Sequence, residues 1–504
     1  MKKLYCAVLC FIFLTTLLLS SCKNGDDNKS GRDNSGATVS GDGNYIANIP
    51  EKDYGGKSFV FLTCGPNQEH ESEIVYNDYT DGGDEKMAKV VNDAISTRNH
   101  SVEELLNIEI KEQYVFDTKR KNGEFANKIR LDISAGSGDY HVLTPCIYDG
   151  AMLAAEGLLF DLNSDIRYLD MSQPWWDQTF NEELTINDKL YFTVGDIGTT
   201  NKSATAALFY NKNLVEKLAL ENPYDLVREH KWTIDKVTQM AKSISSDDNQ
   251  DGKIDYNDSM GWSGQLDDMW ALFYGSGEKI ASIGSDGYPM LTMYNERSTD
   301  VIDAMLKLVQ DDDHYISAND YWGAEGVAWP SLLTIKPFLQ GKCLFFSGNI
   351  STTNDFADMD DDFGIVPVPL YDENQEDYHS LINPWVSSCF AVPKNVAVES
   401  DKEFVGIVLE AMAAAGKNMI QPAFYEVALK YQNTRDDDSI EMLDRIFASR
   451  GCDIGIIFAW GKLDVELQAL ASAAPGTFTS KYESLKDIAQ NQLEETVEFF
   501  KENE

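Results

Sequence analysis

The chain is poor in basic residues: 42 lysines and arginines stand against 83 aspartates and glutamates, a formal net charge of −41 at pH 7. A protein that binds nucleic acid needs a basic surface to displace the counterions condensed on the phosphates. No cluster of Lys and Arg in this sequence is long enough to form one. We therefore exclude nucleic acid as a partner and expect the acidic surface to serve solubility.

The motifs of common enzyme classes are also missing. The sequence has no HExxH zinc motif, no GxSxG nucleophile elbow and no GxxxxGK[ST] phosphate loop, and its six histidines are scattered without metal-ligand spacing. We expect no catalytic residue and no enzymatic activity. Among 83 acidic residues some pair must face a cleft, so a surface glycoside hydrolase stays open as an alternative.

Cysteines are few, and none are spaced as CxxC. Of the eight, two lie in the first apolar run and one, Cys22, stands shortly after it. The five that remain are Cys64, Cys146, Cys343, Cys389 and Cys452. An odd number in apolar surroundings favours buried free thiols over a disulfide framework or a zinc site.

Long apolar runs are confined to the N-terminus. After Lys2 and Lys3, residues 4–19 are almost all apolar, and Leu19-Ser20-Ser21-Cys22 closes the run. The run is shorter than the ~20 residues that a membrane-spanning helix needs, which disfavours an uncleaved signal anchor. The order resembles a bacterial lipoprotein signal peptide over residues 1–21. That resemblance implies cleavage before Cys22, a lipid (diacylglycerol, palmitate) on its thiol, and contact with the membrane through this anchor only.

Residues 22–55 are rich in Gly, Asn, Asp and Ser. So few apolar side chains cannot repay the entropy of ordering the backbone. We expect a disordered polar tether here.

From Lys57 onward, strand-type and helix-type segments alternate. We expect strands at 57–62, 108–116 and 140–144, with helices at 87–106 and 125–133 between them. This order predicts a right-handed parallel unit with ligand sites at the carboxyl ends of its strands.

The alternation then restarts, which predicts a second α/β lobe. We expect a strand at 205–210, helices at 213–218, 233–243 and 296–309, short strands at 343–346, 363–367 and 390–392, and a helical tail from 400 to the end.

Short motifs follow one another in a characteristic order along this region. They are Gly138-Asp139-Tyr140-His141-Val142, Lys189-Leu190-Tyr191-Phe192-Thr193-Val194-Gly195-Asp196, Ala207-Leu208-Phe209-Tyr210-Asn211-Lys212, Trp232-Thr233, Phe338-Leu339-Gln340-Gly341-Lys342-Cys343, Phe363-Gly364-Ile365-Val366-Pro367-Val368-Pro369 and Ala391-Val392-Pro393-Lys394. Together with the lipoprotein-like N-terminus, the set resembles the extracellular solute-binding lipoproteins of bacterial ABC importers, particularly those for sugars.

The resemblance implies an α/β, two-lobed periplasmic-binding-protein-like fold with crossing hinge segments and a helical C-terminal region. Residues 56–195 and 340–390 would form the N-terminal lobe, and residues 196–339 and 391–504 the C-terminal lobe. The implied function is capture of a sugar or oligosaccharide between the lobes and its delivery to the permease subunits of an ABC importer. The protein would be a monomer anchored at the outer face of the cytoplasmic membrane. A receptor for peptides or other solutes stays open.

The sharpest single motif is an acidic loop in the second lobe. Residues 247–258 match the twelve-residue calcium loop of EF-hands, with Gly252 at its sixth position and Ile254 at its eighth. The expected ligands are the side chains of Asp247, Asn249, Asp251 and Asp258 and the carbonyl of Lys253. We expect one structural Ca²⁺, because no partner loop occurs elsewhere; a solvated acidic turn stays open.

Aromatic residues in polar or turn-like contexts are the candidates for binding sugar, because ring faces of sugars stack on flat platforms beside hydrogen-bonding side chains. The candidates are Tyr148, Trp175, Trp176, Trp262, Trp322, Trp385 and Trp460. We favour Trp175-Trp176, because neighbours in an extended segment point to opposite sides and one of them can face the cleft. Trp385 and Trp322 come next. For each of these residues a packing role in the core stays open.

Overall fold

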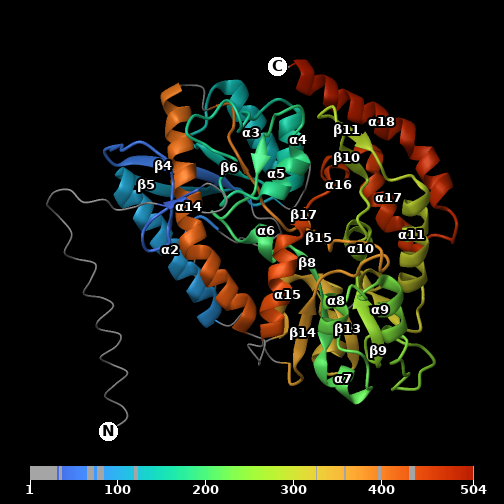
Figure 1. The fold of residues 1–504 in the computed structure, drawn as a ribbon. Coiled ribbons are helices and arrows are strands. Elements are labelled where there is room, and N and C mark those ends of the chain that lie inside the picture. Colours follow the sequence, from blue (N-terminus) through green and yellow to red (C-terminus); the bar gives the residue numbers. More distant parts are fainter. Residues whose placement is uncertain are drawn as a thin grey trace, which may run out of the picture.

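The structure is a computed structural model, and it describes residues 31–32, 37–64, 73–75, 85–117, 123–324, 326–327, 329–356, 359–395, 399–430 and 437–502. The predicted signal peptide and Cys22 lie outside these residues. The described chain forms two α/β lobes, as expected, each built on a five-stranded sheet (Figure 1).

The first lobe contains the predicted parallel unit. Its sheet has the order β5 (Ile108–Tyr114), β4 (Lys57–Thr63), β6 (Val142–Thr144), β16 (Phe390–Ala391) and β7 (Phe192–Thr193). Strand β4 pairs in parallel with both β5 and β6, and β16 alone runs antiparallel to its neighbours. The strands β4, β6 and β7 therefore all end at the same edge of the sheet.

The second lobe has a mixed sheet. Its order is β12 (Tyr315–Ser317), β9 (Met260–Gly264), β13 (Cys343–Asn349), β8 (Ala206–Asn211) and β14 (Phe363–Val366). Strands β12, β9 and β13 are parallel, whereas β8 runs antiparallel to β13 with Ala206 opposite Asn349. The carboxyl ends of β9, β12 and β13 thus lie at the edge where the chain enters β8.

This pairing corrects the predicted allocation of the segments after residue 340. Strands β13 and β14 extend the second sheet, whereas residues 340–390 were expected in the first lobe. Helix α14, expected in the C-terminal lobe, packs along α2 in the first lobe (Figure 1). The physical reason is that both assignments depend on pairing between segments far apart in sequence, which local periodicity does not report.

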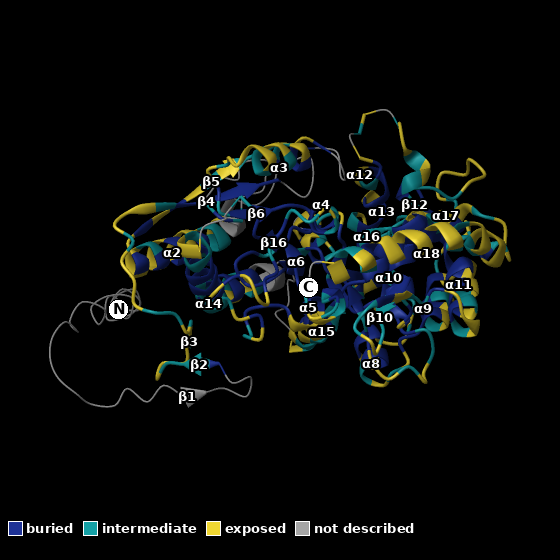
Figure 2. Cartoon of the chain, turned by 90° about the horizontal axis from the view of Figure 1, so that it is seen from above, coloured by how far each residue is buried: buried dark blue, intermediate teal, exposed yellow. Residues whose placement is uncertain are grey.

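Helices cover both sheets. The α-helices are α2 (Glu85–Leu106), α3 (Glu124–Ala135), α4 (Ile147–Ala155), α5 (Gln178–Leu184), α6 (Thr200–Ser203), α7 (Lys212–Lys217), α8 (Pro223–Arg228), α9 (Ile234–Ala241), α10 (Asp268–Gly275), α11 (Glu296–Val309), α12 (Ser331–Thr334), α13 (Lys336–Leu339), α14 (Glu399–Lys430), α15 (Asp437–Ala448), α16 (Ile454–Phe458), α17 (Leu463–Ala469) and α18 (Phe478–Glu502). The 3-10 helices are η1 (Ala318–Tyr321), η2 (Ile350–Phe356), η3 (Trp460–Lys462) and η4 (Leu470–Ser472). Figure 2 shows the outer helices exposed on one side and buried on the other, as amphipathic sequences require.

Smaller sheets complete the fold. They are β1 (Gly31–Arg32) with β2 (Thr38–Val39) and β3 (Tyr45–Ile46), β10 (Ala281–Ile283) with β11 (Pro289–Leu291), and β15 (Ser380–Leu381) with β17 (Arg450–Gly451). None of the helices in the described part of the chain is both long and apolar enough to cross a membrane.

Part of the predicted tether is ordered. The main-chain N–H of Tyr45 donates to Asn418 Oδ1 on α14 (2.9 Å), and Asn418 Nδ2 donates back to the Tyr45 carbonyl (2.9 Å). The Tyr45 ring also meets Trp175 edge-on and lies under the Lys417 ammonium group. Residues 37–55 therefore form a strap on α14, which corrects the expectation of disorder for this part of residues 22–55.

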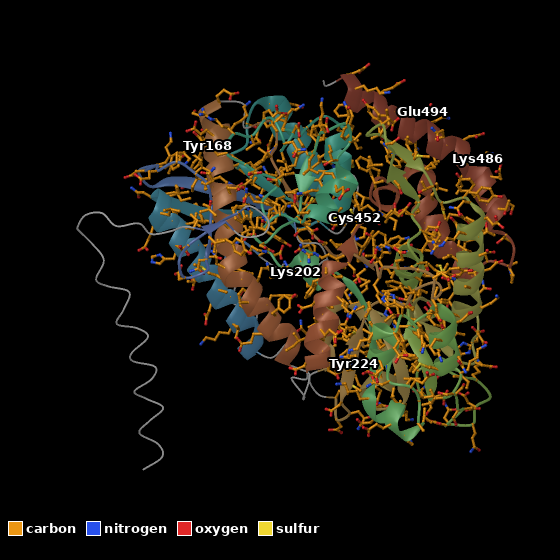
Figure 3. The ribbon with its side chains drawn as sticks, viewed as in Figure 1. Tyr168, Lys202, Tyr224, Cys452, Lys486 and Glu494 are labelled. Atoms are coloured by element: carbon orange, nitrogen blue, oxygen red, sulfur yellow. The ribbon has the colours of Figure 1, made fainter. Side chains whose placement is uncertain are left out.

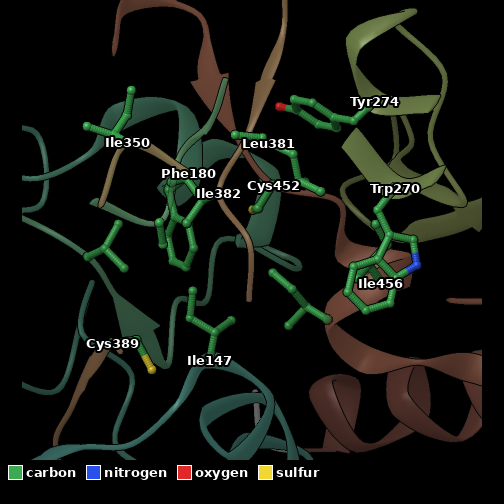
Figure 4. Close-up of a cluster of buried hydrophobic side chains, with 14 of the residues drawn as sticks. Ile147, Phe180, Trp270, Tyr274, Ile350, Leu381, Ile382, Cys389, Cys452 and Ile456 are labelled. Carbon is green, nitrogen blue, oxygen red and sulfur yellow. The ribbon is translucent and has the colours of Figure 1, made fainter. Parts of the chain in front are cut away.

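The two lobes share an apolar core where they meet. Figure 4 shows Ile147 and Phe180 of the first lobe in the same cluster of side chains as Trp270 of the second, together with Leu381 and Ile382 of a crossing segment. All five side chains are buried. The lobes are thus packed against each other along the crossing segments.

Candidate functional site

The carboxyl edges of the two sheets face each other. The chain leaves β7, crosses through α6 and enters β8 at the edge where β9, β12 and β13 end. Strand β14 leads back through β15 to β16 in the first sheet. Ligands of α/β proteins bind outside the carboxyl ends of strands, so the space between these edges is the candidate site.

A narrow hollow lies on the second-lobe side of this space. Its walls are formed by the start of β8, the ends of β9 and β13, the first turns of α10 and the crossing residues Leu381 and Asn383. The cavity volume is about 30 Å³, room for about one water molecule. In this conformation the hollow is therefore too small for a ligand much larger than water.

Asp268 is the central polar group of the hollow. Its Oδ2 atom accepts hydrogen bonds from Ser347 Oγ (2.6 Å) and Tyr315 OH (3.0 Å), and Trp262 Nε1 donates to the same Ser347 hydroxyl (3.1 Å). Burial raises the pKa of Asp268 from 3.8 to about 7, although these hydrogen bonds oppose the shift. The carboxyl group is held rigidly as an acceptor beside a buried indole.

Asp267 binds the crossing segment to the second lobe. Its carboxylate accepts from Asn383 Nδ2 (2.8 Å) and from Gln468 Nε2 (2.8 Å). Burial raises the pKa of Asp267. Tyr148, at the start of α4 in the first lobe, has a pKa raised well above its ordinary value by burial and by the negative charges of Asp464 and Asp267. Tyr148 of the first lobe therefore lies close to acidic groups of the second lobe.

Two of the predicted aromatic candidates meet at this boundary. The rings of Tyr148 and Trp385 are in edge-to-face contact with centroids 6.2 Å apart. Tyr148 is buried, whereas Trp385 is 47% exposed. A third candidate, Trp262, is buried in β9 and lines the hollow.

A second hollow of about 130 Å³ lies beside the first, at the ends of β9 and β13. The two share Gln265, Ser347, Gly348 and Asn349. Among the residues that the structure describes, no lysine or arginine lines either hollow. Both therefore offer carboxylate, amide and hydroxyl groups without a positive charge.

Three predicted platforms are in the core, which corrects the sequence-based expectation. Trp175 and Trp176 are both buried, and Trp176 Nε1 donates to Glu410 Oε2 on α14 (3.1 Å). The helix covers the side on which one indole was expected to face the cleft. Trp460 is buried under α18, stacked on Phe458 and donating to Thr496 Oγ1 (3.0 Å).

Buried ion pairs hold the crossing segments. Lys202, which lies between the lobes in Figure 3, donates to Asp196 Oδ1 (2.7 Å), and both residues are buried. Burial lowers the pKa of Lys202, and the negative charge of Asp196 opposes that shift. Lys417 of α14 reaches the other oxygen of Asp196 (3.4 Å). These contacts connect the first crossing to α14.

The predicted calcium loop folds around its own acidic side chains. Asp247 accepts from the N–H of Asp251 (3.1 Å) and of Gly252 (2.8 Å), and Gly252 has a positive φ of 87° that allows the turn. Asp258 is buried and accepts from the N–H of Asp255 (2.9 Å). Asn249 accepts from Asp251, and Lys253 donates its N–H to Asp251 (3.0 Å).

Carboxylates of this loop are not gathered tightly. Within the described ranges, no group of three or more His, Cys, Asp or Glu side chains is close enough to hold a metal ion. The cysteines Cys64, Cys146, Cys343, Cys389 and Cys452 are buried free thiols, as expected.

Sequence reasoning missed most residues that line the hollows. Asp267 and Asp268 follow the end of β9, a strand of sequence Met-Gly-Trp-Ser-Gly that lacks a strand pattern. Had that strand been recognised, the rule that sites lie at carboxyl ends would have pointed to these residues. Asn383 stands two positions before Trp385, but nothing in the sequence indicates its contact with Asp267.

Comparison with known proteins places the chain in a family. The family model of bacterial extracellular solute-binding proteins matches residues 107–414. No curated protein sequence matches the chain.

Solved structures with the same fold cover most of the chain. An ABC substrate-binding protein of Listeria monocytogenes in complex with cycloalternan aligns with a TM-score of 0.53 and 15% identity, over 87% of this chain and 98% of its own. The maltose/maltodextrin-binding domain of Bdellovibrio bacteriovorus bound to maltotriose aligns with 0.50 and 14%, over 88% and 98%. A solute-binding protein of Thermotoga lettingae bound to α-D-tagatose aligns with 0.51 and 13%, over 87% and 100%.

Proposed function

Because this chain belongs to the bacterial extracellular solute-binding proteins, we propose that it captures a sugar or oligosaccharide between its lobes and delivers it to an ABC importer. The observation that carries the proposal is the pair of facing carboxyl edges with buried acids, amides and indoles between them. Hydroxyl groups of sugars donate to such carboxylates, and their ring faces pack on such indoles.

Hinge opening is part of the proposal. The hollow is too small for a sugar ring while the lobes are packed, so the ligand binds to a more open state and closure surrounds it. Scattering on the protein with a saturating sugar should give a smaller radius of gyration than scattering without sugar. An unchanged radius at saturation would contradict the hinge.

A thermal-shift screen tests the proposed ligand class. Neutral mono- and oligosaccharides, charged sugars and short peptides are compared at one concentration, because a ligand that binds only the folded state raises the melting temperature by mass action. We expect neutral sugars to raise it and peptides to have no effect. A peptide that stabilises the protein while all sugars fail would favour the peptide-receptor alternative.

The protein is proposed to bind without chemistry. The family is one of binding proteins, and the acids at the hollow are engaged by neighbouring side chains rather than arranged as a free acid–base pair. Each sugar that binds should be recovered unchanged after prolonged incubation. Release of reducing ends in proportion to protein concentration would favour the glycoside hydrolase alternative.

The N-terminus is proposed to anchor the protein to the outer face of the cytoplasmic membrane through a lipid on Cys22. The support is the Leu19-Ser20-Ser21-Cys22 junction after the apolar run. Between the proposed anchor and the first lobe, residues 37–55 are held on α14 by the hydrogen bonds of Tyr45 with Asn418. We propose that the anchored protein acts as a monomer.

The loop of residues 247–258 is proposed to bind one Ca²⁺. Its spacing matches the EF-hand loop, and the hydrogen bonds of Asp247 to the N–H groups at its fifth and sixth positions support the same turn. Asp247, Asn249, Asp251, Asp258 and the Lys253 carbonyl are the proposed ligands. The ion would have a structural role in the second lobe.

A further inference from the structure

Two exposed tryptophans lie in the segment that joins η1 to α12 in the second lobe. Trp322 is 60% exposed and Trp329 is 41% exposed, and their ring centroids are 5.9 Å apart at an interplanar angle of 80°. Isolated exposed apolar residues are ordinary, but two indoles in ring contact form a continuous apolar surface. Leu332, also exposed, follows them on α12.

The elements on either side of the pair contribute to the wall of the second hollow. Trp322 follows η1, whose first residue Ala318 lines that hollow, and Trp329 precedes α12, whose residues Ser331 and Leu332 line it. Figure 2 shows α12 on the side of the second lobe that is turned toward the first. The indoles therefore lie within a few residues of the wall of the hollow along the chain, although neither indole is part of that wall.

The second hollow suits a hydroxyl-rich ligand. Gln265, Ser347, Thr352 and Asp355 contribute amide, hydroxyl and carboxyl groups to its wall. Ser347 lines both hollows and also donates to Asp268, so polar groups are continuous from the first hollow, around Asp268, to the second hollow. Apolar platforms beside polar acceptors are what ring faces and hydroxyls of sugars require.

We infer that the Trp322–Trp329 pair is an outer subsite that stacks on a sugar ring beyond the one held at Asp268, and that the ligand is a neutral oligosaccharide. This inference rests on the proposed function. A monosaccharide at Asp268 would leave the indole pair uncovered, whereas a longer chain that follows the polar wall reaches it. The absence of Lys and Arg among the described residues of both hollows excludes a complementary charge for an anionic sugar.

Calorimetry with a length series tests this inference. The probes are glucose, maltose, maltotriose and maltotetraose and the matching mannose series, titrated into wild type, Trp322→Ala and Trp329→Ala. Affinity of the wild type should rise with chain length. Each variant should lose about tenfold to a hundredfold of affinity for the longest ligand, by analogy with base–aromatic stacking, and keep its affinity for the shortest ligand that binds.

The matched control is Tyr294→Ala. Tyr294 is as exposed as Trp329 (41%) but stacks on Tyr482 of α18 with centroids 4.8 Å apart and lines neither hollow. This variant should bind every probe like the wild type. The melting temperatures of free Trp322→Ala and Trp329→Ala should not fall below that of Tyr294→Ala, which also loses a ring contact. Trp322→Phe should restore part of the affinity for long ligands because a ring is kept.

Several results would overturn the inference while the proposed function stands. These are a wild type that binds only monosaccharides, variants whose affinity falls equally for all lengths, and variants that bind every length like the wild type. If Trp322→Ala and Trp329→Ala bound every ligand like the wild type but failed in uptake assays, the pair would contact the importer rather than the ligand. If the wild type bound no sugar of either series, the proposed function would fall together with the inference.

Discussion

Replacing Asp268 with Asn should change how the stability of the protein depends on pH. The carboxyl is buried, accepts hydrogen bonds from Ser347, Tyr315 and the Gln265 N–H, and has its pKa raised from 3.8 to about 7 by that burial. The unfolded chain gives up this proton near the ordinary value. At pH values between 3.8 and about 7, the folded protein therefore binds one proton more than the unfolded chain does.

The sign and size of the effect follow from proton linkage. Because the pKa is higher in the folded state, the contribution to stability is complete below about pH 3.8 and is lost as the pH rises through about 7. One proton corresponds to ~1.4 kcal/mol per pH unit, so the wild type should lose about 3 kcal/mol through this group between about pH 5 and about pH 8. Asn is uncharged at both pH values and can accept the same hydrogen bonds. The free energy of unfolding of Asp268→Asn should therefore fall by about 3 kcal/mol less than that of the wild type over this pH range.

Urea unfolding at the two pH values measures the difference. Other buried acids with raised pKa values, Glu410 at about 8 and Asp453 at about 6, contribute equally to both proteins and cancel. Asp303→Asn, at an exposed position of α11, is the control and should follow the wild type. Parallel profiles for wild type and Asp268→Asn would refute the reasoning, because they would mean that the carboxyl is solvated in the folded protein.

Three further predictions concern the anchor, the strap and the metal loop. Cys22→Ser should move the protein from the membrane fraction to the soluble fraction; a wild type that is itself soluble would contradict lipidation. Asn418→Ala removes two hydrogen bonds to the Tyr45 main chain. Because each lost bond costs ~1 kcal/mol, the strap should detach more often, and protease cleavage near residues 37–55 should become several-fold faster. The melting temperature of the lobes should stay the same. Removal of Ca²⁺ with EGTA should lower the melting temperature, and Asp251→Ala should lower it equally and abolish the EGTA effect, because the acidic side chains repel one another without the cation. Equal melting temperatures in EGTA and in excess Ca²⁺ would show that the loop holds no structural ion.

Local pattern alone predicted the elements of the first lobe. The apolar strand at Lys57–Thr63 and the helix at Glu85–Leu106 lie within a few residues of the expected bounds, and their alternation required parallel pairing. In the second lobe the long helix at Glu296–Val309 agrees with the expected range, since its apolar residues recur at helical spacing and Asn295 caps its first turn. These features depend on residues close together in the chain, which the sequence reports directly.

Non-local contacts decided what lies in the cleft. Met260–Gly264 is a strand only because β12 and β13 pair with it on both sides, and its position is what brings Asp268 to the carboxyl edge. Trp176 is buried against α14, where Glu410, more than two hundred residues later, accepts its N–H. Trp322 stays 60% exposed although Trp329 contacts its ring. Whether an aromatic side chain is core or platform depends on which distant segment covers it, and that is determined by tertiary packing rather than by its neighbours in sequence.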